Sequence, residues 1–299
     1  MQHLKLSNSF TLSRIVAGIM RIQSIADNNQ NVLSFIEQAY DLGIDSFDSA
    51  DIYGNYECEK IFGNALALKP FLRNKIKIVS KCGIMLLSDK FPDRKVKYYD
   101  YSYEHIVGSV NKTLKDLRTN YIDLLLLHRP SPFFNPEEVA RAFTELMESG
   151  KVLNFGVSNF LRSDIELLES YTNEKIITNQ VEISVACTEH FDNGNINYLM
   201  QKRIKPMAWS PLGGGSIAKP ETVRDLTIHD ELVKIAAENN ASPEMVALAW
   251  LLNHPAQIIP IVGTTKTERL KEAVDSLEIK LTTEQWFRIY QAARGEEVL

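Results

Sequence analysis

The chain has 299 residues, of which 44% are hydrophobic and 24% charged, a composition typical of a soluble globular protein. Its formal net charge of -5 argues against nucleic acid or an anionic membrane as the main partner, because both require a basic surface. The three cysteines, Cys58, Cys82 and Cys187, are too widely spaced for a disulfide framework or a paired metal site. With neither a signal-like N-terminus nor an apolar run of about 18 residues, we expect a cytoplasmic protein without a metal.

The chain begins with two short alternating segments around Ser7–Ser9, which predict a β-hairpin. After it, strand and helix patterns alternate. The predicted strands are 15–20, 44–48, 75–81, 122–128, 152–157, 176–182, 206–209 and 258–262. The predicted helices are 31–42, 57–68, 103–117, 136–149, 162–171, 196–202, 229–239, 243–253 and 267–277.

The strands are continuously apolar rather than alternating, which predicts a parallel sheet whose outer face is covered by helices. Eight strand–helix pairs in this length favour a (β/α)8 TIM barrel, preceded by the short N-terminal hairpin, over an open sheet. The first strand also lacks the G-x-G-x-x-G turn of a dinucleotide-binding open sheet. We expect one domain over residues 1–299. Three long irregular segments, 82–102, 183–194 and 210–228, follow strands and are expected to be functional loops.

Three polar side chains end or follow predicted strands where a barrel carries its chemistry: Tyr53, Lys81 and His128. Asp48 ends the strand before Tyr53. A free phenol is a weak acid at neutral pH, and a neighbouring ammonium favours its ionised form. Taken singly, a packed aromatic, a solvated strand end and a capped core histidine would explain these residues. Together they indicate a proton-handling site.

These residues resemble a known family. The segments 47–54 (FDSADIYG) and 126–130 (LLHRP), with the strand-ending Lys81, are similar to the Asp, Tyr, Lys and His tetrad of the aldo-keto reductases. The segment 150–160 (GKVLNFGVSNF) resembles a second signature of that family. The likeness runs from Ile15 to the C-terminal helix, and within the family it is greatest to bacterial general oxidoreductases of the YdhF-like type.

The resemblance implies NADPH as cofactor, bound across the barrel mouth without a Rossmann unit. Ser158, Asn159 and Gln180 match the positions that bind the carboxamide, and Trp209 matches the aromatic on which the nicotinamide stacks. A core aromatic is the alternative for Trp209, and a solvated surface arginine is the alternative for Arg269. The remaining matches, to the pyrophosphate and adenosine-phosphate segments, are Ser210, Pro211, Leu212, Gly213, Gly263, Thr264, Thr265, Arg269 and Glu272. Arg269 suits a 2′-phosphate, which favours NADPH over NADH.

Two positions depart from the family pattern. Cys58 stands where many members have serine, and we expect it to be a small buried residue rather than a reactive thiol. Ala273 stands where many have asparagine, which puts one adenine contact in question. The segment 82–102 carries Tyr98, Tyr99 and Tyr101, which suit either a wall of the substrate pocket or a surface loop.

From these observations we expect an NADP-dependent oxidoreductase that reduces aldehydes or ketones to alcohols by hydride transfer. Tyr53 is the expected general acid, Lys81 lowers the pKa of its phenol, Asp48 holds Lys81, and His128 orients the carbonyl. The alternatives are an NADPH-holding sensor of the same fold with little turnover, and a barrel hydrolase or isomerase without nucleotide. The expected partner is a small carbonyl compound, and the chain is expected to be a monomer or a weak homo-oligomer. The physiological carbonyl, the strictness for NADPH and the role of segment 82–102 are not given by the sequence.

Overall fold

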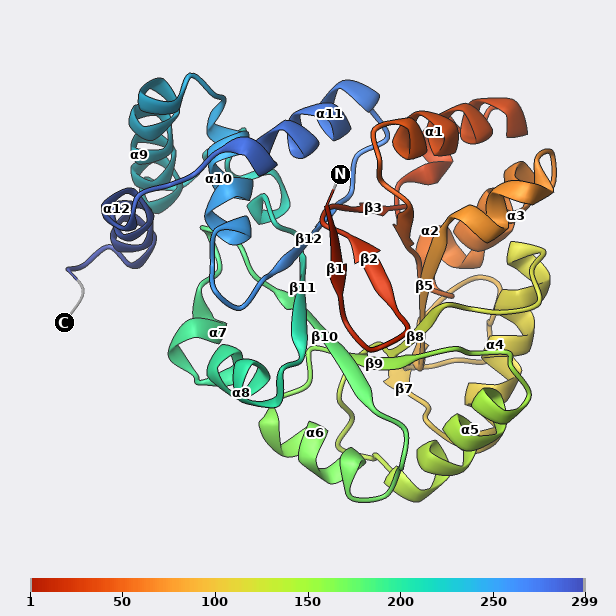
Figure 1. The fold of residues 1–299 in the computed structure, drawn as a ribbon. Helices are drawn as coiled ribbons and strands as arrows, with labels where there is room; N and C mark the ends of the chain where they lie inside the picture. The colour runs from red at the N-terminus through yellow and green to blue at the C-terminus, as the bar shows by residue number, and fades with distance from the viewer. Residues whose placement is uncertain (1, 298–299) are drawn as a thin grey trace. The chain divides into compact units, whose positions relative to one another are not determined.

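A computed structural model describes residues 2–297, and within them eight parallel strands close into a barrel, with helices between the strands (Figure 1). This confirms the predicted (β/α)8 fold. Residues 1, 298 and 299, the ends of the predicted 1–299 domain, lie outside the described part. The strands follow one another around the barrel in chain order. They are β3 (Val16–Gly18), β4 (Ser46–Asp48), β5 (Lys77–Cys82), β8 (Leu124–Leu127), β9 (Phe155–Ser158), β10 (Ile176–Glu182), β11 (Lys205–Trp209) and β12 (Ile259–Val262).

The N-terminal hairpin is confirmed as β1 (His3–Lys5) paired antiparallel with β2 (Thr11–Ser13). Its polar groups bind the chain where β4 begins. The backbone N–H of Ser13 donates to Oγ of Ser46 at 2.9 Å, and His3 contacts the Asp45 carboxylate at 2.8 Å. The hairpin therefore lies at the amino end of β4, away from the carboxyl ends that carry the predicted chemistry.

The contacts divide the chain into two compact units. The first unit comprises the residues up to Asn179 with Gly263–Thr267, and the second comprises Gln180–Val262 with the residues from Glu268 onward. The expectation of one domain over residues 1–299 stays a prediction.

In the first unit, helices lie on the outer side of strands β3 to β9 (Figure 1). Polar caps begin several of them: Asn28 accepts from the N–H of Asn31, and Ser102 from that of His105. Pro136 occupies the first turn of α5, where no N–H is needed. The helical segments are α1 (Asn29–Asp41), α2 (Tyr53–Tyr56), α3 (Cys58–Leu66), α4 (Tyr103–Leu117), α5 (Pro136–Glu148) and α6 (Arg162–Glu169), with 3₁₀ turns η1 (Ile22–Ile25) and η2 (Pro70–Lys75).

In the second unit, three helices pack together beyond the strands: α9 (Val223–Asn239), α10 (Pro243–Leu252) and α12 (Thr283–Arg294) (Figure 1). The rings of Trp250 and Trp286 stack between α10 and α12, with centroids 4.8 Å apart. Each indole N–H donates to the other residue's carbonyl. The other elements here are α7 (Glu189–Asp192), α8 (Asn195–Lys202), η3 (Gly213–Gly215), α11 (Thr267–Asp275), whose first residue belongs to the first unit, and η4 (Ser276–Glu278).

All three predicted irregular segments contain regular structure, which corrects the prediction that they are irregular throughout; their role as functional loops stays a prediction. Segment 82–102 includes an antiparallel pair, β6 (Ile84–Met85) with β7 (Tyr98–Tyr99), and segment 183–194 includes α7. Segment 210–228 is helical from Val223, because Thr222 caps α9 in a reciprocal pair of hydrogen bonds with Asp225.

Candidate active site

Lys81 is the centre of a buried polar cluster at the carboxyl end of β5. Its Nζ donates to Oδ2 of Asp48 at 2.7 Å, to the carbonyl oxygen of Ser49 at 2.6 Å and to the phenolic oxygen of Tyr53 at 3.0 Å. An ammonium has three N–H donors, so these contacts use all of them. The Lys81 side chain has no exposed surface. The cluster therefore holds one cation in a fixed position between a carboxylate and a phenol.

Backbone pairing explains how these groups meet. Strand β4 runs parallel to β5, with Asp48 opposite Val79. After β4 ends, the chain continues to bond to β5. The N–H of Ser49 donates to the carbonyl of Val79 at 2.8 Å, and the N–H of Asp51 donates to that of Lys81 at 3.1 Å. The chain is thereby kept beside β5 until it reaches Tyr53.

Burial and charge act in opposite directions on the two proton-carrying groups. Burial raises the pKa of Tyr53 above its ordinary value, and this outweighs the lowering effect of Lys81. The expected influence of Lys81 is present, but the net shift of the phenol is upward. For Lys81, burial lowers the pKa, but Asp48 and Tyr53 together raise it above the ordinary value. The phenol therefore keeps its proton, and the ammonium keeps its charge, at neutral pH.

His128 follows β8 and is buried beside Tyr53. The two rings meet edge to face, with centroids 5.9 Å apart and planes at 76°. Burial lowers the pKa of His128 well below its ordinary value, and Lys81, Arg129 and Lys97 add to the effect. Its Nδ1 has no hydrogen-bond partner among residues 2–297. The imidazole is therefore neutral, with one ring nitrogen unused.

The backbone directly after Tyr53 has an unusual conformation. Gly54, Asn55 and Tyr56 have φ values of 58°, 56° and 67°, so three successive residues lie in the left-handed region. A non-glycine residue there costs about 1–3 kcal/mol, and a bulky aromatic is a rare occupant. At Gly54 a Cβ would approach Sγ of Cys58 to 2.5 Å, so glycine is also required for space. Segment α2 is therefore a strained turn rather than a helix.

Tyr101 connects the segments that follow β5 and β8. Its hydroxyl donates to the carbonyl of Arg129 at 2.5 Å and accepts from the N–H of the same residue at 3.0 Å. Gly83, with φ of 108°, packs so closely on the Tyr101 ring that a Cβ would lie 2.0 Å from it. Tyr101 is thus a buried residue that links these two segments by hydrogen bonds, whereas Tyr98 in β7 is exposed.

Two more of the predicted residues lie at the carboxyl end of β9. Ser158 is the last residue of that strand, and Asn159 has a φ of 61°. The Asn159 amide donates to Oγ of Ser158 at 2.8 Å and, in a longer contact of 3.5 Å, to the carbonyl of His128. A hydroxyl and an amide of the type predicted for a carboxamide contact are therefore linked to the residue beside Tyr53.

Gly263, Thr264 and Thr265 follow β12 and lie against the segment after β3. Arg21 donates to the carbonyl of Gly263 at 2.8 Å, and Ser24 shares a hydrogen bond with Thr265 at 3.2 Å. Neither Arg21 nor Ser24 is among the site residues predicted from the sequence. An arginine three residues past β3 was the available signal.

In the second unit, Gln180 is buried on β10, and Trp209 is the half-buried last residue of β11. The chain then turns through Ser210–Gly213, closed by a 2.8 Å bond from the N–H of Gly213 to the carbonyl of Ser210. Ser210 and all three residues of η3 have positive φ. A Cβ at Gly213 would lie 2.6 Å from Oγ of Ser216. This glycine-rich turn offers backbone groups without side-chain cover.

Arg269 and Glu272 are exposed on α11, whereas Ala273 on the same helix is buried. An exposed guanidinium is compatible with either of the alternatives stated for Arg269. Ala273 offers no polar group at the position where many members of the resembled family have asparagine.

Two buried carboxyl groups lie behind β5 and were not assigned from sequence. Glu59 accepts from Ser80 at 2.5 Å and from Thr113 at 2.8 Å, and Asp51 accepts from Ser109 at 3.0 Å. Burial raises the pKa of both, that of Asp51 to about 7.

Cys58 is buried as expected, and burial raises the pKa of its thiol to about 11, which does not favour a reactive thiolate.

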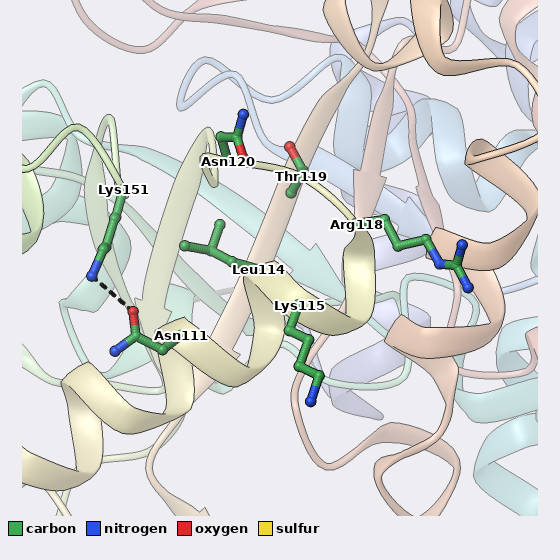
Figure 2. Close-up of a pocket in the computed structure, with 7 residues that line it drawn as sticks. All are labelled: Asn111, Leu114, Lys115, Arg118, Thr119, Asn120 and Lys151. Atoms are coloured by element: carbon green, nitrogen blue, oxygen red, sulfur yellow. Dashed lines mark hydrogen bonds between the residues drawn. The ribbon is translucent and has the colours of Figure 1, made fainter.

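A hollow of about 420 Å³ lies at the opposite end of the strands in the first unit, where α4 ends and the chain enters β8 (Figure 2). It is lined by Asn111, Leu114, Lys115, Arg118, Thr119, Asn120 and Lys151. Its cations lie where the carbonyl end of α4 carries partial negative charge, a position that cations ordinarily occupy.

Two further features are absent within residues 2–297. No group of three His, Cys, Asp or Glu there could hold a metal ion, and no helix there is long and apolar enough to cross a membrane.

Comparison with known proteins gives matches over almost the whole chain. A model of the aldo/keto reductase family matches residues 14–294. The uncharacterized oxidoreductase YcsN of Bacillus subtilis is 46% identical, and the 6-dehydroglucose reductase of Agrobacterium fabrum is 43% identical, each over 100% of both chains. The oxidoreductase YdhF of Escherichia coli is 44% identical over 96% of this chain and 95% of its own.

Among solved structures, the thermostable aldo-keto reductase Tm1743, in complex with the inhibitor epalrestat, is similar with a TM-score of 0.82. It is 25% identical in sequence, and the match covers 98% of this chain and 100% of the other.

Proposed function

This protein belongs to the aldo/keto reductase family, within its bacterial oxidoreductase branch, and from that membership we propose that it reduces an aldehyde or ketone to an alcohol with NADPH. The observation that carries the proposal is the Lys81 ammonium, which donates at once to Asp48 and to the Tyr53 phenol inside a buried cluster. Such a cluster makes a phenol into a proton donor whose anion is stabilised when it forms.

In the proposed mechanism Tyr53 is the general acid. Its raised pKa keeps the proton on the phenolic oxygen until a substrate oxygen becomes more basic than the phenolate. The proton then passes from Tyr53 to that oxygen, and the negative charge left on the phenolate lies 3.0 Å from Lys81 Nζ. Lys81 stays protonated because Asp48 balances its charge in the buried cluster.

His128 is proposed to orient the carbonyl. It is neutral, and its ring packs edge to face on Tyr53. A neutral imidazole can donate one hydrogen bond without competing with Tyr53 to supply the proton. We therefore assign it a role in directing the carbonyl oxygen toward the phenol.

NADPH, when bound, supplies the hydride. The residues of each unit, taken by themselves, have the chemistry that this cofactor requires. In the first unit these are the hydroxyl and amide of Ser158 and Asn159 beside His128, and the segment Gly263, Thr264 and Thr265. In the second unit they are Gln180, Trp209, Ser210, Pro211, Leu212, Gly213, Arg269 and Glu272, with the glycine-rich turn whose shape a Cβ at Gly213 would disrupt.

The substrate class we favour is a sugar aldehyde. A relative that is 43% identical over its whole length carries the name 6-dehydroglucose reductase.

Replacing Tyr53 with phenylalanine tests the proposal. We expect NADPH oxidation by a panel of aldehydes to slow by about 10²- to 10⁴-fold, because the acid is lost while the ring remains. The dissociation constant of NADPH, measured by quenching of tryptophan fluorescence, should be nearly unchanged. Turnover retained by Tyr53→Phe would contradict the assignment of the acid. Wild-type protein that binds NADPH but turns over no carbonyl would favour a sensor instead.

A further inference from the structure

The strained turn after Tyr53 is held by a distant stretch of the chain. The 54–56 turn comprises Gly54, Asn55 and Tyr56, all in the left-handed region. The holding segment, residues 86–94, lies between β6 and β7 and is here called the 86–94 loop. Because two residues of the turn are not glycine, the turn needs outside contacts to keep this conformation.

Asn55 attaches the turn to the 86–94 loop through both ends of its amide. Its Nδ2 donates to Oδ1 of Asp89 at 2.9 Å, and its Oδ1 accepts from Oγ of Ser88 at 2.6 Å. Oδ1 of Asp89 also lies 3.2 Å from Oγ of Ser88, so the single O–H of Ser88 is shared between Asn55 and Asp89. Rotation of the turn would break two hydrogen bonds at once.

Tyr56 makes a second attachment through its hydroxyl, which accepts from the N–H of Leu86 at 3.2 Å and from Arg94 at 2.8 Å. Arg94 also donates to the carbonyl of Leu86 at 3.2 Å, and its guanidinium lies 3.7 Å from the centre of the Phe91 ring. That ring meets Tyr56 edge to face at 5.0 Å. An ion pair between Lys90 and Glu57 continues the contact past the turn.

A separate segment also binds the turn: Nε2 of Gln23 donates to the carbonyl of Gly54 at 3.0 Å. Contacts from two separate segments therefore hold the turn, which directly follows Tyr53, the residue whose phenol is hydrogen-bonded to Lys81. Small displacements matter there, since a misplacement of about 1 Å can cost about 10²-fold in rate.

We propose that Asn55, Tyr56 and Arg94 are positioning residues: through them the 86–94 loop keeps the 54–56 turn left-handed and so keeps the Tyr53 phenol on Lys81. This rests on the proposed role of Tyr53 as the acid. The loop therefore contributes to the proton transfer itself, in addition to any contact with substrate.

Asn55→Gly is the first test, because glycine accepts a positive φ without strain while both links to Ser88 and Asp89 disappear. We expect kcat for a fixed aldehyde to fall about 10- to 100-fold, with KM, NADPH affinity and Tm within about twofold or a few degrees of wild type. The matched control is Arg118→Gly, which relieves a φ of 52° at the end of α4. It should leave kcat unchanged. An unaltered kcat in Asn55→Gly would overturn the proposal.

Arg94→Met is the second test, made in wild type and in the Tyr53→Phe background. A positioning role requires that it lower kcat in wild type and have little further effect once the phenol is gone. The control is Arg141→Met, which removes another arginine that lies over an aromatic ring, that of Tyr103, at 4.0 Å. Arg94→Lys should recover part of the loss, because one donor to Tyr56 returns.

Equal losses from Arg94→Met in both backgrounds would show a merely structural role and overturn the inference. The proposed function fails separately: wild-type protein without Tyr53-dependent carbonyl reduction contradicts that function whatever the Arg94 variants do. Normal Tyr53 dependence with a fully active Arg94→Met contradicts only the positioning inference.

Discussion

The two ends of the strands in the first unit carry similar residue types in very different environments. At the carboxyl end, Lys81 is fully buried and pairs with the nearly buried Asp48. At the amino end, Lys115 and Arg118 are exposed, and Lys151 bonds a neutral amide, that of Asn111, at 2.8 Å (Figure 2). By our proposal, the charge that takes part in the chemistry is the one from which the fold excludes water.

The backbone differs between the two ends as well. The carboxyl end has three consecutive left-handed residues held by side chains more than 30 positions away. At the amino end, the turn after α4 has one non-glycine residue in the left-handed region, Arg118, at the end of a helix where such a conformation is common. The end that we propose to be catalytic is therefore the one whose backbone is strained and is held in that conformation by residues distant in the sequence.

Lys81→Met should have the largest effect and tests whether the buried charge is essential. It keeps the length of the side chain but leaves the Asp48 carboxylate buried without its cation. We expect turnover to fall by at least about 10²- to 10⁴-fold and the free energy of unfolding to fall by about 3–5 kcal/mol. Steady-state kinetics and urea unfolding measure the two effects.

The double variant Asp48→Asn with Lys81→Met is the control for that experiment. Removing the second charge should recover part of the stability and none of the turnover. Full activity in Lys81→Met would remove the chemical distinction between the two ends.

Asp51→Asn should have the next largest effect, on the pH dependence of stability. Burial and, to a smaller extent, the nearby Glu59 carboxyl raise the pKa of Asp51 from 3.8 to about 7, although Ser109 and Lys112 oppose the shift. Between these pH values the folded state keeps a proton that the unfolded state has released. Wild-type stability should therefore fall as pH rises from about 4 to 7, by a few kcal/mol at about 1.36 kcal/mol per unit.

The asparagine variant should lose most of this slope, measured as urea unfolding at pH 5 and pH 8. The Glu59 carboxyl, whose pKa burial also raises, leaves a remaining dependence of the same sign. An unchanged slope in Asp51→Asn would mean that Asp51 is not the group that burial perturbs.

Lys151→Ala, at the amino end, should have the smallest effect. Its side chain is partly exposed and donates a hydrogen bond to Asn111, so the free energy of unfolding should change by no more than about 0.5 kcal/mol. Turnover should stay at the wild-type value. A fall in turnover comparable to that of the carboxyl-end variants would remove the contrast between the ends.

Much of the fold was predictable because the patterns that specify it are local. The helix at Tyr103–Leu117 and the strand at Ile176–Glu182 occur with the predicted bounds, since apolar spacing and flanking turn residues mark both. Helix α9 begins six residues before the predicted 229, because its start depends on the Thr222–Asp225 pair rather than on apolar spacing. The short pair β6–β7 carries too few residues to show a pattern.

The chemical members of the cluster were predictable because strand ends in a parallel barrel converge. Asp48, Tyr53 and Lys81 do meet. The net pKa of Tyr53 was not predictable, because it depends on how completely the fold buries the ring. The 54–56 turn was not predictable either. Its conformation depends on Ser88, Asp89 and Arg94, which nothing near Asn55 in the sequence indicates.

The fit of Gly83 beneath Tyr101 has a consequence for engineering this barrel. Any side chain at position 83 would displace the Tyr101 ring, and with it both hydrogen bonds to the peptide of Arg129, next to His128. The segments after β5 and β8 are therefore not independent modules. A segment transplanted from a relative to change specificity must bring its residues 83 and 101 as a matched set, and it must suit the host's peptide at 129.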